Sequence, residues 1–253
     1  MGIEFFHHRW PVFHADNHLL VVYKPAGLLV QGDDSGDVCL LDLARRWVKQ
    51  RYHKPGNVFL GLVHRLDRPV AGVMMFARTS KAAARLSAAL RSRDTRKCYW
   101  VVLEGRPPAP AGVLADQIER DGRTSRIVSG RTAASREARL SYRLLGSAFG
   151  RSQVAVELET GRRHQIRLQF AHRGCPIVGD VRYGAPAPMP SRQIALFSKE
   201  LSVAHPTRRE ALTFVSPLPV GWPWPGIAPD ASAPLWNWAD YPLPPATASA
   251  PGT

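Results

Sequence analysis

One carboxylate in the sequence lies among cations, in a short polar segment between two apolar runs. Asp67 belongs to the segment His64-Arg65-Leu66-Asp67-Arg68-Pro69. An acid held among guanidinium groups stays ionised and is oriented by charge-assisted hydrogen bonds, which suits a nucleophile or a general base. A structural Asp–Arg pair at the end of a strand has the same pattern, so this segment alone leaves both interpretations open.

A second polar segment lies further along the chain. Its residues are Thr160-Gly161-Arg162-Arg163-His164-Gln165-Ile166-Arg167, and Gly179-Asp180 and Tyr183-Gly184 follow it. The arginines, the histidine and the glutamine offer several hydrogen-bond donors to an acidic partner. A basic loop that begins a helix and binds any phosphate has the same composition, so this segment too has two interpretations.

Taken together, these segments resemble the RluA-type pseudouridine synthases in order and spacing. The resemblance extends from Lys24-Pro25-Ala26-Gly27 to Ser198-Lys199-Glu200-Leu201 and His205-Pro206, and so covers about residues 12–219. Four motifs carry it: His64-Arg65-Leu66-Asp67 with Gly72, Lys97-x-Tyr99 with Gly105, Gly161-Arg162-x-His164-Gln165-Ile166-Arg167, and Gly179-Asp180-x-x-Tyr183-Gly184.

The resemblance implies isomerisation of a uridine within RNA, with neither a metal nor an organic cofactor. Asp67 would be the catalytic carboxylate, acting either as a nucleophile or as the base that removes a ribose proton. Arg167 would pair with Asp67, and Tyr99 would stack on the target uracil and serve a late proton transfer. Arg65 would fill the gap that the extruded nucleotide leaves in the base stack. Further substrate-binding residues are expected at His64, Arg68, Arg162, His164 and Gln165.

The chain departs from the family pattern in two places. Val70-Ala71 replaces the more usual Thr-Ser before Gly72, which removes a hydroxyl near the loop of Asp67. Phe197 stands where many relatives carry a histidine. Activity is still expected, and the effect of Phe197 has no explanation at the level of sequence.

The charge of the chain favours a polyanionic partner. The formal net charge is +14, from 34 lysines and arginines against 20 acids. Such a surface attracts phosphate backbones, although a GC-rich genome that inflates the arginine content, or charged runs that are solvated faces, would give the same composition. No S4-type RNA-binding module is expected before residue 12, so the catalytic domain would hold the RNA itself. The expected contacts to the RNA backbone are Arg120, Arg123, Arg126, Arg131 and Arg136.

Several other classes of protein are disfavoured. No apolar run has the roughly 20 residues of a membrane helix, and the first residues lack the pattern of a signal peptide, so a cytoplasmic protein is expected. The three cysteines and nine histidines show no metal-ligand or disulfide spacing. A monomer without an obligate protein partner is expected.

The elements that must position these residues form a mixed α and β pattern. The resemblance implies an α+β fold, a mixed and largely antiparallel sheet flanked by helices, with the active cleft across its middle. Short strands are expected within residues 12–30, and helix-like spacing or alanine-rich sequence predicts helices at 40–52 and at 80–90, capped by Thr79 or Ser80. A third helix is considered at 163–172. Further strands are predicted at 60–63, 73–77, 98–103, 138–145, 153–159, 194–201 and 211–215, and the arginine-rich segment is expected to form an exposed hairpin.

Three segments are distinguished: an amino-terminal segment at 1–11, the catalytic domain at 12–219, and a tail rich in proline, alanine and tryptophan at 220–253. The tail is expected to be irregular and partly disordered. Its residues Trp222, Trp224, Trp236 and Trp238 would either form a base-stacking strip or fold back on an apolar groove.

An RNA pseudouridine synthase acting on ribosomal or transfer RNA is thus the predicted function, with the choice of RNA and uridine open. The alternative is a catalytically inactive RNA-binding protein on the same scaffold. A phosphate-handling hydrolase is disfavoured because paired metal-binding carboxylates and a phosphate-cradling glycine loop are lacking.

Overall fold

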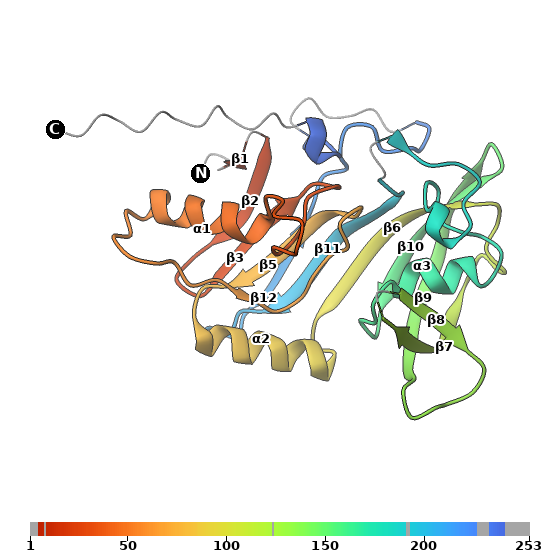
Figure 1. The fold of residues 1–253 in the computed structure, drawn as a ribbon, viewed down its shortest axis with the longest axis horizontal. Coiled ribbons are helices and arrows are strands. Elements are labelled where there is room, and N and C mark those ends of the chain that lie inside the picture. Colours follow the sequence, from red (N-terminus) through yellow and green to blue (C-terminus); the bar gives the residue numbers. More distant parts are fainter. Residues whose placement is uncertain (1–4, 8, 123, 191–192, 227–232, 241–253) are drawn as a thin grey trace.

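The computed structural model describes residues 5–7, 9–122, 124–190, 193–226 and 233–240, and these form one long sheet with helices packed on it (Figure 1). The three α-helices of this part are α1 (Leu40–Arg51), α2 (Ser80–Ser92) and α3 (Gln165–Ala171). The strands are β1 (Phe5–His7), β2 (Trp10–Ala15), β3 (Leu19–Lys24), β4 (Gly61–Leu62), β5 (Ala71–Ala77), β6 (Arg96–Glu104), β7 (Ala111–Asp121), β8 (Thr124–Val128), β9 (Arg136–Ala148), β10 (Arg151–Leu158), β11 (Leu196–Ala204) and β12 (Ala211–Val215).

The sheet is mixed and largely antiparallel, which confirms the predicted fold class. Its order is β1-β2-β3-β5-β11-β6-β10-β9-β7-β8, with β12 paired to β11 and β4 paired to β5. Among the described strand pairs only β5 and β11 are parallel, joined by Phe197 opposite Ala71 and Ser198 opposite Gly72. This short parallel contact links the amino-terminal strands to the remainder of the sheet.

Alternating apolar residues bury both faces of the central strands. In β3, Leu20 and Val22 belong to the main core, whereas Leu19 and Val21 belong to a second core on the opposite face. Helices α1 and α3 contribute to the main core, and α2 covers the second through Ala82 and Leu86. In Figure 1, α3 lies beside β8 and β9, far from α1. The period of two in the strands and the helical spacing of the apolar residues therefore produce a sheet covered on both sides.

The helices form where the sequence predicts them. Helix α1 has buried residues at Leu40, Ala44 and Val48, a spacing of four that keeps one face on the core. Thr79 precedes helix α2, and its side-chain oxygen accepts a hydrogen bond from the amide of Ala82 at 3.1 Å, so Thr79 rather than Ser80 is the cap. None of the helices in the described ranges is long and apolar enough to cross a membrane.

The polar segment around Asp67 lies on the connection between β4 and β5, as predicted. Strand β4 is shorter than the predicted strand at 60–63, because only Gly61 and Leu62 pair with β5. Strand β5 is buried along its whole length. A rigid, buried strand therefore fixes one end of the loop.

The arginine-rich segment forms the expected hairpin. Strand β7 pairs with β8 from Gln117–Val128 to Asp121–Thr124, and it pairs with β9 on its other side. Arg123, at the turn, lies outside the described residues.

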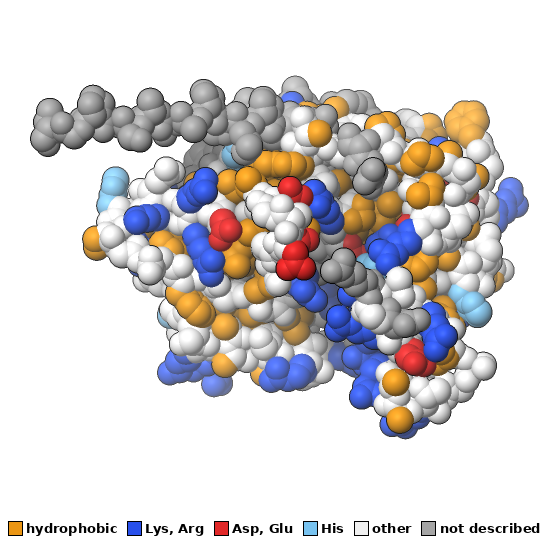
Figure 2. Space-filling model, viewed as in Figure 1, with side chains coloured by type: hydrophobic (Ala, Val, Ile, Leu, Met, Phe, Trp, Pro, Cys, Tyr) orange, Lys and Arg blue, Asp and Glu red, His pale blue; other side chains and the backbone are white. Residues whose placement is uncertain are grey.

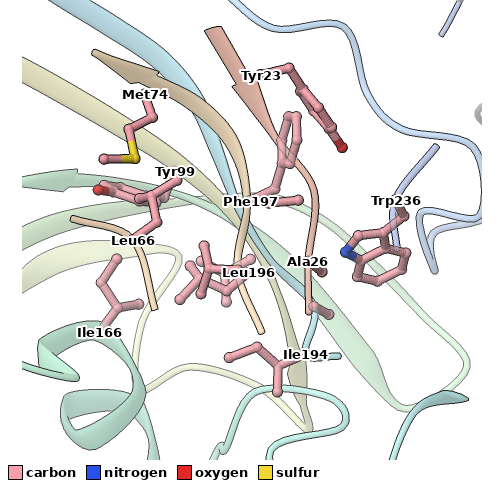
Figure 3. Close-up of a cluster of buried hydrophobic side chains, with 14 of the residues drawn as sticks. Tyr23, Ala26, Leu66, Met74, Tyr99, Ile166, Ile194, Leu196, Phe197 and Trp236 are labelled. Carbon is pink, nitrogen blue, oxygen red and sulfur yellow. The ribbon is translucent and has the colours of Figure 1, made fainter. Parts of the chain in front are cut away.

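The described part of the tail folds back on the main core. Trp222 and Trp236 are 7% and 2% exposed, and their rings lie 5.4 Å apart. Figure 3 shows Trp236 on the same side of the cluster as Ala26, near Phe197 and Tyr23. Buried rings are not available to stack on bases, so Trp222 and Trp236 do not form a base-stacking strip. Residues 227–232 and 241–253, with the predicted disorder, lie outside the described residues.

Candidate active site

A buried lysine anchors the loop that carries Asp67. The Nζ of Lys24, which is fully buried, donates to the carbonyl oxygens of Pro25, Asp67, Arg68 and Val70 at 2.9, 3.3, 3.1 and 2.6 Å. Burial lowers the pKa of Lys24 to about 7, and the negative charge of Asp67 acts in the opposite direction. Since Lys24 ends β3, this strand fixes the backbone at Asp67 and just after it, as far as Val70.

Gly72 allows the next strand to approach this loop closely. Its φ is 126°, and a Cβ on it would overlap the backbone oxygen of Ser198 and lie 2.7 Å from the amide nitrogen of that residue. Gly72 lies within β5, where it permits the parallel contact with β11, rather than in a turn. The glycine is therefore required by the contact between the two parts of the sheet.

The guanidinium of Arg167 connects two carboxylates. Its Nη1 donates to Oδ2 of Asp67 at 3.1 Å, and its Nε and Nη2 donate to the two oxygens of Asp180 at 2.7 and 2.8 Å. The side chains of Arg167 and Asp180 are 6% and 2% exposed, whereas that of Asp67 is 29% exposed. The ring of Tyr183 packs on the guanidinium, with its centroid 4.9 Å away. Arg167 is thus fixed from three sides, and its remaining nitrogen orients Asp67 and stabilises its negative charge.

His164 approaches the same oxygen of the Asp67 carboxylate as Arg167 does. Its Nε2 is 3.6 Å from Oδ2 of Asp67, and its Nδ1 is hydrogen-bonded to the hydroxyl of Tyr183 at 2.6 Å. Burial lowers the pKa of His164 to about 4, although Asp67 opposes this effect, and Arg167 adds to it. The ring is therefore neutral at pH 7. His164 has a φ of 55°, a left-handed conformation that turns the chain into α3.

Tyr99 lies in the wall of the same cavity and is 7% exposed. Burial, and after it the charge of Asp67, raises the pKa of the Tyr99 hydroxyl, so the phenol is protonated at neutral pH. Figure 3 shows the ring close to Leu66, with Ile166 below both. The phenol thus belongs to an apolar surface at the edge of the polar site.

These residues share one cavity of about 730 Å³. A volume of this kind is within the range of small-molecule sites and accommodates a nucleotide. The cavity brings together eight of the residues that the sequence indicates as catalytic or substrate-binding, namely His64, Arg65, Asp67, Tyr99, Arg162, His164, Gln165 and Arg167.

Arg68 is not brought into this cavity. Its Nε donates to the carbonyl of Gly27 at 2.9 Å, and its Nη2 pairs with Asp37 at 2.8 Å. The side chain is exposed and does not line the cavity. Of the two arginines that flank Asp67 in the sequence, Arg68 is directed elsewhere, and the distant Arg167 supplies the guanidinium that contacts the carboxylate.

Two of the lining residues, His64 and Gln165, form hydrogen bonds to other parts of the protein through their side chains. The Nε2 of His64 accepts a hydrogen bond from the amide of Met75 at 3.1 Å, and burial followed by the charge of Lys97 lowers the pKa of His64 to about 3. The side chain of Gln165 accepts from Thr160 at 2.8 Å and donates to the carbonyl of Arg139 at 3.1 Å. Both side chains hold the loops that surround the cavity.

The described arginines predicted to hold the RNA backbone lie on the β7–β8 hairpin and on the segment that leads from it into β9, away from the cavity lining. Arg120 donates to the carbonyl of Gly122 at 3.1 Å, and Arg126 lies 3.7 Å from Glu119. Arg136 donates to the carbonyls of Ala133 and Ser135, and Arg131 is exposed. None of these four described arginines lines the cavity.

Several residues that build the site have no role that sequence reasoning assigns. Asp180 and Tyr183 are visible in the sequence only as members of a motif, and Lys24 only as part of a turn. Their partners lie far away in the sequence: Arg167 and Asp67 are 100 residues apart, and Lys24 contacts carbonyls more than 40 residues later. The burial of Asp180 and of Lys24 would have indicated that each has a partner of this kind. Burial, however, is known only once the fold is known.

The two departures from the family pattern have different surroundings. Phe197 is fully buried, with its ring centroid 6.5 Å from that of Tyr23 and 5.8 Å from that of Trp222 (Figure 3). It belongs to the core and does not line the cavity. Val70 does line the cavity and is 2% exposed, so the loop of Asp67 has an apolar contact where the family pattern has a hydroxyl.

Among the described residues, one group has the composition and spacing of a metal site. Its members are His14, Asp16 and His205, whose ligand atoms lie within 4.8 Å of one another. Both histidines are hydrogen-bonded to Asp16, at 3.0 and 2.8 Å. The amides of Thr207 and Arg208 donate to Nδ1 of His205, so its Nε2 carries the proton given to Asp16 and has no lone pair for a metal. This arrangement suits a structural hydrogen-bond cluster.

Comparison with known sequences places residues 18–172 in the family described as RNA pseudouridylate synthase. An uncharacterized RNA pseudouridine synthase of Synechocystis is 32% identical over 82% of this chain, which spans 65% of that protein's length. The ribosomal large subunit pseudouridine synthase D of Pseudomonas aeruginosa is 32% identical over 84% of this chain and 69% of its own length.

The fold is similar to that of a solved human structure. The human RNA pseudouridylate synthase domain containing 4 superposes with a TM-score of 0.71 at 26% identity. The superposition covers 83% of this chain and 89% of the human chain. The similarity thus extends over most of the sheet described above.

Proposed function

The chain belongs to the RNA pseudouridylate synthase family, and on that premise we propose that it converts a uridine within RNA to pseudouridine with Asp67 as the catalytic carboxylate. The reaction is an isomerisation. The bond between N1 of uracil and C1′ of ribose breaks, the base rotates, and C5 bonds to the same C1′. The proton on C5 is lost and N1 gains one, so the product has the atoms of the substrate.

One observation supports this role most directly. Three charged side chains are joined by ion pairs: buried Asp180 fixes buried Arg167, and Arg167 orients Asp67. Of the three, only the carboxylate of Asp67 is partly exposed. A preorganised carboxylate at a cavity suits both routes open to it, attack on C1′ or removal of a ribose proton. Lys24 holds the backbone around it, so little reorganisation is needed during the reaction.

The neighbouring residues have roles that follow from their positions. Tyr99 stacks on the extruded uracil, because its ring lies in the apolar wall of the cavity. Its protonated hydroxyl supplies or relays a proton late in the reaction. Arg65 is exposed at the cavity and fills the gap in the RNA stack.

The substrate is an RNA in which the target uridine is turned out of its stack. Extrusion exposes C1′ to Asp67, and it costs least in loops and single strands. The Pseudomonas relative has the ribosomal large subunit in its name, so ribosomal RNA is the first substrate to test, with transfer RNA beside it.

The test is tritium release from RNA labelled at C5 of uracil, because the C5 hydrogen is lost to water only when C5 bonds to ribose. Unmodified large-subunit ribosomal and transfer RNA transcripts are assayed separately. We expect release from one pool, and Asp67→Asn is expected to abolish release while retaining RNA binding and thermal stability. Undiminished release by Asp67→Asn contradicts the role of Asp67. Tight binding without release from either pool favours the alternative, an inactive RNA-binding protein.

A further inference from the structure

The cations at the cavity differ in whether the protein supplies them with a partner. Arg167 is paired with two acids, Arg162 donates to the carbonyl of Glu137, and Arg93 lies 4.0 Å from Glu159. The side chains of the other four basic residues of the lining form no hydrogen bond or ion pair with any described residue: Arg65, Arg91, Lys97 and Arg163. The cavity therefore has more positive charge than the protein neutralises.

Lys97 is the most informative of these residues because its side chain is also partly buried. Its burial lowers the pKa of its ammonium, and its Nζ lies 3.6 Å from the position of a Cβ on Gly161. Removing a cation from water without a partner costs free energy, which an anion at the site recovers. The ammonium therefore lies beside Gly161 at the cavity wall.

Three of the four residues lie along one continuous wall. Helix α2 ends at Ser92 and β6 begins at Arg96, so Arg91 and Lys97 flank a short connection. The ion pair between Arg93 and Glu159 joins the end of α2 to the segment that leads to Gly161 and Arg163. We call Arg91, Lys97 and Arg163 the basic wall. Figure 2 shows Lys and Arg side chains gathered along the hollow in the middle of this face.

We propose that the basic wall binds the backbone phosphates of the RNA next to the extruded uridine. The inference rests on the proposed function for the identity of the polyanion. Phosphate contacts fix the register of a nucleic acid on a protein without reading its sequence, and unpaired cations suit this task. Since the wall and Asp67 line the same cavity, phosphates held there place the flanking nucleotides beside the carboxylate.

This proposal differs from the expectation that the arginines of the hairpin region make the main contacts to the RNA backbone. Arg120 and Arg136 donate to carbonyls of their own hairpin region, and Arg126 lies near Glu119. Those arginines have local partners and lie away from the cavity lining. The two sets carry the same charge and can be compared directly.

The experiment compares two triple variants of the full chain, both in the Asp67→Asn background so that the RNA is not modified. One carries Arg91→Gln, Lys97→Gln and Arg163→Gln, and the other carries Arg120→Gln, Arg126→Gln and Arg136→Gln. The dissociation constant of each unmodified transcript is measured against salt concentration. Each lost phosphate contact is expected to reduce the slope of log affinity against log salt by about 0.7–0.9. The variant with three substitutions in the basic wall, the wall triple, should thus reduce the slope by about 2–2.7. The variant with three substitutions in the hairpin region, the hairpin triple, should have a slope close to that of the Asp67→Asn parent.

A reduced slope in the hairpin triple alone, or an equal reduction in both triples, overturns the proposal. Thermal melting of both proteins confirms that they are folded. With Asp67 restored, the wall triple is expected to raise KM for pseudouridine formation by about tenfold or more at physiological salt, with a smaller effect on kcat.

The same measurements separate this inference from the proposed function. If the parent forms no pseudouridine while the wall triple still flattens the salt dependence, the phosphate contacts stand and the proposed function fails. If the parent forms pseudouridine and the wall triple matches its slope and KM, the proposed function stands and this inference fails.

Discussion

At the scale of single residues, the site depends on the way Arg167 divides its hydrogen bonds. Two of its nitrogens are bound to Asp180 and one to Asp67, and the first pair is almost fully buried. The buried acid therefore sets the position of the guanidinium, and the guanidinium sets the position of the exposed acid. Under the proposed function Asp180 would be a positioning residue, since it contacts Arg167 and does not line the cavity.

Asp180→Asn is expected to reduce both stability and the rate of reaction. Breaking a buried ion pair costs about 3–5 kcal/mol, because the remaining charge loses its partner. Denaturant unfolding measures the loss of stability, and tritium release per folded molecule measures the loss of kcat as Arg167 is freed.

The matched control is Asp116→Asn. Asp116 forms a bidentate pair with Arg173 at 2.8 and 3.1 Å, next to the same helix, but Arg173 does not line the cavity. This variant should lose stability while kcat per folded molecule stays unchanged. An equal loss of kcat in both variants argues that Asp180 has no positioning role.

At the scale of elements, the sequence predicts the helices and strands whose formation depends on residues close together in the chain. Helices α1 and α2 appear at their predicted positions because their apolar residues recur with the period of one helical face. Strand β3, within the range where short strands are expected, is an apolar run that is buried on both faces. The pairing of β5 with β11 is not predictable in this way, because it joins segments whose contacts are 125 residues apart. The need for glycine at position 72 follows from that pairing and so could not be read from the loop motif alone.

Gly72→Ala is expected to destabilise the protein by more than about 4 kcal/mol, because the new Cβ meets the backbone of Ser198 and no side chain can move aside. Gly105→Ala is the control. Gly105 also has a positive φ, of 78°, but a Cβ there would meet no atom within 4 Å, so only the conformational cost of about 1–2 kcal/mol applies. Equal losses in chemical denaturation of the two variants contradict the role of close approach at Gly72.

At the scale of the whole molecule, the core extends beyond the region that resembles the family. Trp10 near the amino terminus and Trp222 and Trp236 in the tail belong to the same core as the central strands. The sequence alone leaves two interpretations of the tail tryptophans open, base stacking and packing on an apolar groove. The composition of the tail does not distinguish an RNA base from the protein core as the partner of these rings. The boundaries at residues 11 and 219 remain a proposal about the extent of the catalytic domain.

Trp236→Ala is expected to cost about 3–5 kcal/mol of stability, since the ring is 2% exposed, and to leave RNA affinity per folded molecule unchanged. Phe149→Ala is the control for loss of an aromatic ring, because Phe149 is 91% exposed and its removal should not change thermal stability. Weaker RNA binding by Trp236→Ala without loss of stability contradicts a role confined to the core.

The distance along the chain between the partners of the site has a consequence for folding. Asp67 follows β4, while Arg167 lies in α3 and Ser198, which packs on Gly72, lies in β11. The hairpins β7–β8 and β9–β10 close over short stretches of chain, but the contact of β5 with β11 must close a loop of more than a hundred residues, and such long-range pairings form slowly. A chain emerging from the ribosome has Asp67 long before it has the residues that orient it. We therefore expect catalytic competence to appear late in folding, as a property of the joined sheet that neither half of the chain possesses.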